Sequence, residues 1–135
     1  MGTSDQLSPA VWVLVVDDDE SICETLKMVL ESRGYTVRSA MNGQEALDAM
    51  REDVPALVLS DLMMPVLSGT DLLARMKLDA RLAGIPVVML TAWPANAANI
   101  GAAGLLRKPV TATKLMEAVA THVRGGREAL GAAQS

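Results

Sequence analysis

Short apolar runs recur at regular intervals along the chain, and three of them are apolar without interruption. These three cover residues 11–16, 56–60 and 86–91. A strand that is apolar on both faces is typical of a parallel sheet with helices packed on both sides. Two further runs, YTVRSA at 35–40 and GLLR at 104–107, complete a set of five expected strands.

Helical patterns separate these strands. Ile22, Leu26 and Val29 recur at the spacing of one helix face. Ser21 is placed as the N-cap of this helix, and Gly34 lies just past its end. Since similar stripes follow the later strands, the alternation predicts an open, doubly wound α/β sheet with right-handed crossovers.

One helix of this pattern has little room. The segment between Thr91 and Gly101 contains WPANAANI, which can form one or two helical turns at most. We therefore expect the fourth helix to be shortened or remodelled.

Length and charge limit the possible functions. A chain of 135 residues fits one domain with a single core, and its net charge of −4 argues against nucleic acid as the main partner. Residues 1–92 hold 14 acids and 7 bases, a net of −7, whereas residues 93–135 hold 2 acids and 5 bases, a net of +3. The basic final third is either a docking surface or a solvated basic face.

The sequence indicates a soluble, cytoplasmic protein. Its single cysteine, Cys23, excludes an internal disulfide and is expected to be a buried helix residue. There is no signal-peptide pattern and no apolar run of membrane-spanning length, so no membrane partner is expected. We expect one domain at 11–123 between flexible segments at 1–10 and 124–135.

Polar residues follow four of the five expected strands. The carboxyl ends of parallel strands meet at one edge of an open α/β sheet, which is where such sheets bind ligands. The residues placed there are Asp17, Asp18, Asp61, Thr91 and Lys108.

This set of residues suits phosphoryl chemistry. Three carboxylates tolerate one another around a divalent cation, and hard oxygen ligands suit Mg²⁺. A cation, a lysine and a threonine hydroxyl around Asp61 form a phosphoryl site, in which an aspartate can itself be the nucleophile. For Asp19 and Glu20 the favoured interpretation is different: acids in a loop or at a helix N-terminus.

The same residues carry the motifs of a known family. VLVVDDDES (13–21), ALVLSDLMMPVLSG (56–69), VVMLTA (87–92) and GAAGLLRKPV (101–110) together resemble the CheY-like receiver domain of two-component response regulators. The resemblance spans about residues 11 to 123. It implies a flavodoxin-like fold, with five parallel strands in the order 2-1-3-4-5 and helices on both faces.

The resemblance also implies roles in phosphorylation and metal binding. Asp61 would accept a phosphoryl group from a phosphohistidine on a sensor histidine kinase or phosphotransfer protein. Asp18, Asp61 and the backbone carbonyl of Met63 would bind Mg²⁺ directly, and Asp17 would bind it through water.

Two further residues have roles that follow from the family alone. Lys108 would pair with the acceptor carboxylate and then with a phosphoryl oxygen. Thr91 would move to hydrogen-bond the phosphoryl group, and that movement would carry the signal. The Lys108–Pro109 peptide bond is often cis in such domains.

The resemblance also implies that the protein is not an enzyme in the usual sense. A receiver catalyses only its own phosphorylation and dephosphorylation, and it signals through protein contacts.

The chain departs from the family pattern in its switching half. Leu105 stands where the fifth strand commonly carries an aromatic switch residue, and the fourth helix is short. We therefore expect intact phosphorylation chemistry with an unusual readout. Trp93 and Met63 occupy positions that flank the phosphoryl group, which suggests slow dephosphorylation; the alternative is that Trp93 packs on a neighbouring loop.

Two other functions remain open at the level of sequence. A receiver-like docking module that is never phosphorylated fits the altered helix and the basic final third. A haloacid-dehalogenase-type phosphohydrolase fits the D-x-D-x-S pattern at 17–21, but no Asp follows Asp79 to supply that family's late metal ligand. No helix-turn-helix follows the fifth strand, so no DNA-binding output is expected within these residues, and the chain could act alone or belong to a longer regulator.

Overall fold

The computed structural model describes residues 12–93 and 97–123. The strands are β1 (Trp12–Val16), β2 (Thr36–Ala40), β3 (Leu57–Asp61), β4 (Val87–Thr91) and β5 (Gly104–Arg107). The helices are α2 (Glu20–Glu31), α3 (Gly43–Glu52), α4 (Gly69–Lys77), α5 (Ala97–Ile100) and α6 (Ala112–His122). The segments 1–10 and 124–135, which the sequence predicts to be flexible, lie outside the described residues.

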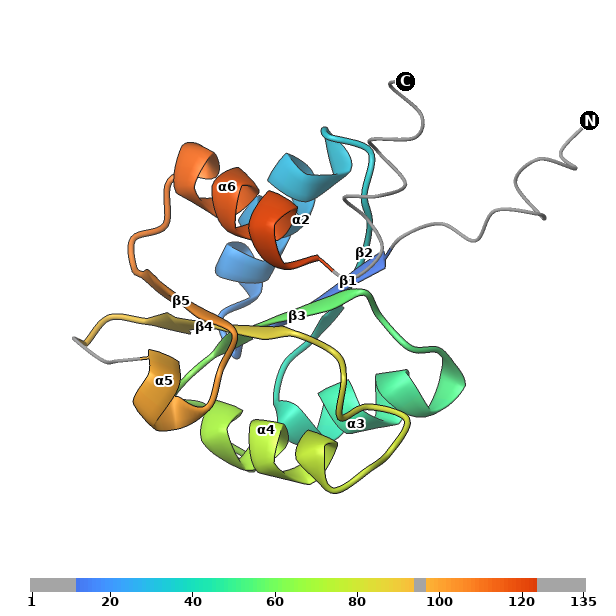
Figure 1. The fold of residues 1–135 in the computed structure, drawn as a ribbon. Helices are drawn as coiled ribbons and strands as arrows, with labels where there is room; N and C mark the ends of the chain where they lie inside the picture. The colour runs from blue at the N-terminus through green and yellow to red at the C-terminus, as the bar shows by residue number, and fades with distance from the viewer. Residues whose placement is uncertain (1–11, 94–96, 124–135) are drawn as a thin grey trace, which may run out of the picture.

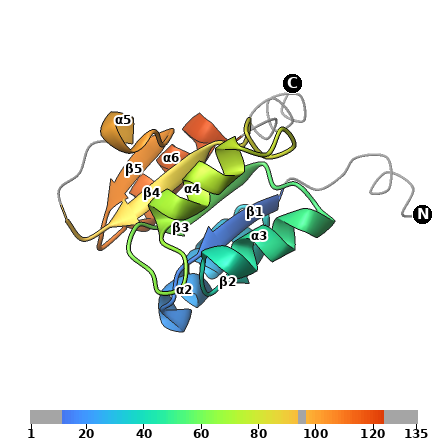
Figure 2. The same cartoon turned by 90° about the horizontal axis from the view of Figure 1, so that it is seen from below.

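The described strands form one parallel sheet in the order β2-β1-β3-β4-β5. The helices lie on both faces of this sheet, with α2 and α6 on one side and α3, α4 and α5 on the other (Figures 1 and 2). The predicted doubly wound, flavodoxin-like fold is therefore confirmed.

Each face of the sheet has its own core, because side chains alternate along the strands. Val58 and Met89 belong to the cluster that packs under α3 and α4. Their neighbours Leu59 and Leu90 belong to the cluster under α2 and α6. Strands β1, β3 and β4 are buried at every position, which explains why their sequences are apolar without interruption.

Helix α2 begins two residues before the position that the sequence suggested. Asp19 is its N-cap, and the Asp19 carboxylate accepts hydrogen bonds from the backbone N–H groups of Ser21 and Ile22. The expectation that Ser21 caps this helix is wrong, because a carboxylate accepts several N–H groups and also complements the helix dipole. The Ser21 hydroxyl instead donates to Asp19 Oδ1 at 2.7 Å. The interpretation of Asp19 and Glu20 as helix-start acids is thus confirmed.

The β4–β5 connection contains the shortened helix. Helix α5 has four residues, Ala97–Ile100, as the length of the segment predicts. Gly101 follows it with φ of +84°, a conformation that favours glycine, and its carbonyl accepts a hydrogen bond from Lys77 Nζ at 3.0 Å. None of the helices in the described part of the chain has the length and apolar character needed to cross a membrane.

Candidate phosphoacceptor site

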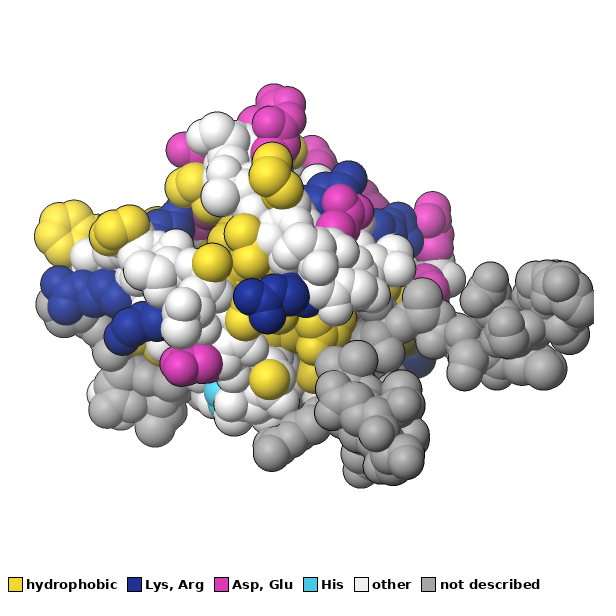
Figure 3. All heavy atoms as spheres, turned by 90° about the horizontal axis from the view of Figure 1, so that it is seen from above, with side chains coloured by type: hydrophobic (Ala, Val, Ile, Leu, Met, Phe, Trp, Pro, Cys, Tyr) yellow, Lys and Arg dark blue, Asp and Glu magenta, His cyan; other side chains and the backbone are white. Residues whose placement is uncertain are grey.

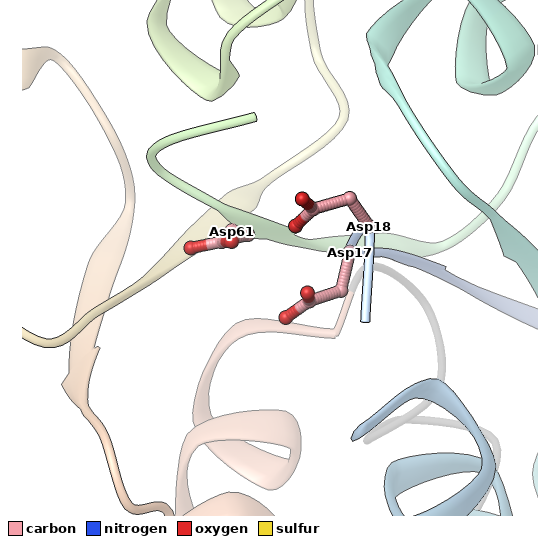
Figure 4. Close-up of side chains that lie close together, drawn as sticks. All are labelled: Asp17, Asp18 and Asp61. Atoms are coloured by element: carbon pink, nitrogen blue, oxygen red, sulfur yellow. The ribbon is translucent and has the colours of Figure 1, made fainter. Parts of the chain in front are cut away.

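Three carboxylates meet where β1 and β3 end. Asp17 and Asp18 follow β1, and Asp61 is the last residue of β3. Because Val16 is in register with Ser60, the two strands end side by side. One oxygen from each carboxylate lies within 4.8 Å of the others, and Figure 4 shows the three groups on the same side of the strand ends.

These carboxylates differ in their contact with solvent. Asp17 is fully buried and Asp61 is 8% exposed, whereas Asp18 is exposed. Burial raises the pKa of Asp61, and the charge of Asp17 raises it further, while Lys108 opposes both effects. Ionised Asp61 is therefore held in an environment that disfavours its negative charge.

Lys108 supplies a positive charge from the loop after β5. Its Nζ lies 2.9 Å from Asp17 Oδ2 and 3.4 Å from Asp61 Oδ1. Burial alone would lower the pKa of Lys108, but the hydrogen bond and charge of Asp17, with a smaller contribution from Asp61, raise it overall. Lys108 is therefore protonated at neutral pH and joins the two buried carboxylates. The Lys108–Pro109 peptide bond is cis.

The donor set fits a divalent cation with hard-ligand preferences. Three carboxyl groups face one ammonium group, and a divalent cation can balance the negative charge that the acids develop. Asp17 already uses both oxygens, because Oδ1 accepts the N–H of Asp19 at 2.9 Å and Oδ2 accepts from Lys108. This leaves the oxygens of Asp18 and Asp61 as the better candidates for direct metal binding.

Thr91 ends β4 beside these groups and is 1% exposed. Its Oγ1 accepts a hydrogen bond from the backbone N–H of Trp93 at 3.0 Å, a contact that the sequence analysis did not foresee. The backbone carbonyl of Thr91 also accepts the N–H of Lys108 at 2.8 Å. The polar residues at the ends of β1, β3 and β4, and Lys108 after β5, therefore converge at one edge of the sheet, as predicted.

The loop after Asp61 has an unusual backbone. Val66 has φ of +68°, and the N–H of Leu67 donates to the carbonyl of Pro65 at 2.7 Å, so the loop turns within three residues. Gly69 then begins α4 in direct contact with β3, where a Cβ atom would collide with the carbonyl of Asp61. The side chain of Met63, in the same loop, is 67% exposed.

Cys23 supports the site from α2. Its thiol donates a hydrogen bond to the backbone carbonyl of Asp17 at 3.3 Å. Burial, followed by the nearby charge of Asp17, raises the pKa of Cys23 to about 11, so the thiol is protonated at neutral pH. The expectation of a buried helix cysteine is confirmed.

A mostly apolar groove lies next to the site on the α2 side. It has a volume of about 450 Å³ and runs from Lys108 between α2 and the loop that leads to α6. Its lining includes Ile22, Thr25, Pro109 and Val110. Figure 3 views the face covered by α2 and α6, where hydrophobic side chains gather in the middle around a basic side chain.

A comparison with known protein families distinguishes between the receiver and the phosphohydrolase as the class of this protein. The sequence pattern of the response regulator receiver domain matches residues 13–120. The chain belongs to this family. Receiver domains of two-component response regulators are signalling modules in which phosphorylation on an aspartate and binding of Mg²⁺ are typical. Membership contradicts the alternative of a haloacid-dehalogenase-type phosphohydrolase.

Two named relatives of this chain are response regulators. The chain is 45% identical over 80 residues to the DNA-binding response regulator MtrA of Mycobacterium tuberculosis, a match that covers 59% of this chain and 34% of MtrA. It is 39% identical over 87 residues to the response regulator Rre1 of Synechocystis, covering 64% and 38% of the two chains. The matched region is thus little more than a third of either relative.

Solved structures show the same fold. The receiver resembles the chemotaxis protein CheY4 of Vibrio cholerae with a TM-score of 0.79 and 28% identity, over 84% of this chain and 99% of CheY4. It resembles the receiver domain of a histidine kinase from Syntrophus aciditrophicus with a TM-score of 0.77 and 31% identity, over 83% and 89% of the chains.

Proposed function

We propose that Asp61 of this receiver accepts a phosphoryl group from a phosphohistidine on a sensor histidine kinase or phosphotransfer protein. The observation that supports the assignment most strongly is the position of Asp61. Its carboxylate ends β3 within 3.4 Å of Lys108 Nζ and within reach of Asp17 and Asp18. Asp17 is buried and engaged on both oxygens, so Asp61 is the better nucleophile.

The transfer would use the residues of the site in distinct roles. An oxygen of ionised Asp61 attacks phosphorus, the new O–P bond forms, and the N–P bond breaks with its electron pair left on the imidazole. The Lys108 ammonium stabilises the negative charge on the phosphoryl oxygens, and the Thr91 hydroxyl can donate to one of them. Mg²⁺, held by Asp18, Asp61 and the Met63 backbone carbonyl with Asp17 acting through water, would neutralise further charge.

The donor would approach beside α2. The groove that begins at Lys108 offers an apolar surface directly next to the acceptor, and Ile22 and Val110 lie along it. A partner helix that carries the phosphohistidine could bury apolar side chains there while its imidazole reaches Asp61. On this proposal residues 11–123 form the working unit, which acts in the cytoplasm, catalyses only its own phosphorylation and dephosphorylation, and signals through protein contacts.

Incubation with Mg²⁺ and acetyl phosphate, followed by intact mass measurement, tests the assignment. We expect one added phosphoryl group, lost in Asp61→Asn and after chelation of the metal. Asp71→Asn is the matched control, because Asp71 is an exposed acid in the first turn of α4. No adduct together with no Mg²⁺ binding would instead favour a docking module that acts without phosphorylation.

A further inference from the structure

A hydrogen bond joins the side chain of Thr91, at the buried end of β4, to the exposed residue Trp93. The Trp93 N–H donates to Thr91 Oγ1 at 3.0 Å. Thr91 is 1% exposed, whereas Trp93 is 69% exposed. The backbone of Trp93, which carries a large exposed side chain, is therefore bonded to one buried hydroxyl group.

The hydroxyl group of Thr91 can form few hydrogen bonds at one time. It has one hydrogen to donate and lone pairs that accept, and only 1% of Thr91 is exposed to solvent. A rotation that turns the hydroxyl toward a new partner on Asp61 changes the position of Oγ1 relative to the Trp93 N–H. Because a hydrogen bond weakens steeply with distance and angle, this N–H then loses its acceptor.

Other described elements near Thr91 are poorly suited to transmit such a change. Leu105, on the neighbouring strand β5, is an aliphatic side chain that packs partly buried against the core under α3 and α4. Helix α5 is a single turn. Trp93, by contrast, is two residues from Thr91, directly bonded to it and exposed.

We infer that Trp93 reports the state of Thr91: phosphorylation of Asp61 draws the Thr91 hydroxyl away, breaks the bond from the Trp93 N–H and repositions the exposed indole. This inference rests on the proposed function of Asp61. It assigns the readout of this receiver to Trp93, two positions after Thr91, rather than to a ring on β5. The side chain of Trp93 is exposed to any partner that docks over this edge.

Tryptophan fluorescence can measure this coupling directly. The chain has two tryptophans, and Trp12→Phe leaves Trp93 as the only tryptophan, which excitation at the red edge of the tryptophan band selects over Tyr35. Trp12 is buried, and its indole nitrogen has no hydrogen-bond partner among the described residues, so the change to Phe removes no such bond. The phosphoryl mimic is beryllofluoride with Mg²⁺; its binding is followed independently by the ¹⁹F signal of the bound form.

Two substitutions at Thr91 separate the effect of the Trp93–Thr91 hydrogen bond from the binding of beryllofluoride. Thr91→Ser keeps a hydroxyl that can accept the Trp93 N–H, and Thr91→Val removes it with little change in size. In the Trp12→Phe background we expect beryllofluoride to change the emission and acrylamide quenching of Trp93. Thr91→Ser should keep this response. Thr91→Val should show the altered quenching before any addition and lose the further response.

The outcomes distinguish the inference from the function on which it rests. If beryllofluoride binds and Thr91→Val still responds like its parent, the inference is overturned while the proposed function stands. Unaltered Trp93 quenching in metal-free Thr91→Val overturns it as well. If no bound ¹⁹F signal forms in the parent, the proposed function of Asp61 fails and the inference fails with it.

Discussion

The half of the sheet that holds the acidic site differs from the half that ends in β5. Strands β1 and β3 are buried at every position, lie in the middle of the sheet and place three carboxylates within 4.8 Å of one another. Strand β5 lies at the edge, none of its four residues is fully buried, and the helix before it has four residues. The part that positions the acceptor is thus supported on both faces, and the part around β5 and α5 is much reduced.

This difference indicates which part of the structure can tolerate changes in sequence. Phosphoryl transfer requires carboxylates and an ammonium group at fixed distances, and a well-packed pair of central strands provides that rigidity. A readout needs only a bond that responds to the occupied site, which a two-residue contact such as Thr91–Trp93 can supply. The chemistry and the readout can therefore vary independently.

Paired leucine truncations give the largest test of this contrast. Leu59 on β3 is completely buried, and Leu59→Ala should lower the free energy of unfolding by about 3 kcal/mol because a cavity remains. Leu105 on β5 is half-buried, and Leu105→Ala should cost about 1 kcal/mol. Urea unfolding measures both. Equal losses would contradict the proposed difference between the two halves.

Removal of the central cation should have the next largest effect. Lys108→Met leaves Asp17 and Asp61 without their ammonium partner and should cost about 2 kcal/mol of unfolding free energy in the absence of Mg²⁺. Addition of Mg²⁺ should restore part of this loss. Lys114→Met is the control, since Lys114 is exposed on α6, and should change stability by less than about 0.5 kcal/mol. A Lys108 variant as stable as the parent in metal-free buffer would show that the acids do not need this cation.

Neutralising Asp61 should have the opposite sign. Its pKa is raised in the folded protein by burial and by Asp17, so the native state binds the proton more tightly than the unfolded state. Folding stability then falls as the pH rises from the ordinary range of a carboxyl group through the raised pKa. Metal-free Asp61→Asn should be more stable by about 1 kcal/mol at neutral pH and should lose this part of the pH dependence.

The control for this prediction is Asp71→Asn. Asp71 is exposed in the first turn of α4, where its charge complements the helix dipole. Its replacement should leave stability unchanged or slightly reduced. Thermal unfolding at several pH values checks both variants, and a loss of stability in Asp61→Asn would be evidence against an electrostatically disfavoured acceptor.

The smallest expected change in stability concerns only the part of the molecule around α5 and β5. Lys77→Met removes the hydrogen bond to the Gly101 carbonyl and should cost about 0.5 kcal/mol. Amide exchange should become faster at 97–101 and stay unchanged in β1 and β3. Lys27→Met on α2 provides a matched exposed lysine. Faster exchange throughout the sheet would mean that the two halves are coupled more strongly than we infer.

The sequence predicted the fold and the residues of the candidate site through simple rules. Unbroken apolar runs gave buried parallel strands, and the carboxyl ends of such strands must meet, so Asp17, Asp61, Thr91 and Lys108 could be placed at one edge. The short segment before Gly101 predicted a helix of one or two turns for the same kind of reason, since chain length limits helix length, and α5 has four residues.

The sequence could not predict which partner each polar atom would choose. Asp19 and Ser21 both suit an N-cap, and the choice of Asp19 depends on where the backbone turns after β1. The strained turn at Val66 has a positive φ at a residue other than glycine, so the sequence does not signal it. The Trp93 N–H reaches Thr91 through a local turn that threonine permits but does not require. These details depend on backbone angles that no apolar periodicity specifies.

Chemical trapping tests most directly whether Asp61 becomes an acyl phosphate. Borohydride reduces an aspartyl phosphate to homoserine, which peptide mass mapping can locate after treatment with Mg²⁺ and acetyl phosphate. We predict homoserine at position 61 and intact aspartate at positions 17 and 18. Homoserine at another position, or none under conditions in which Mg²⁺ binds, would contradict the account.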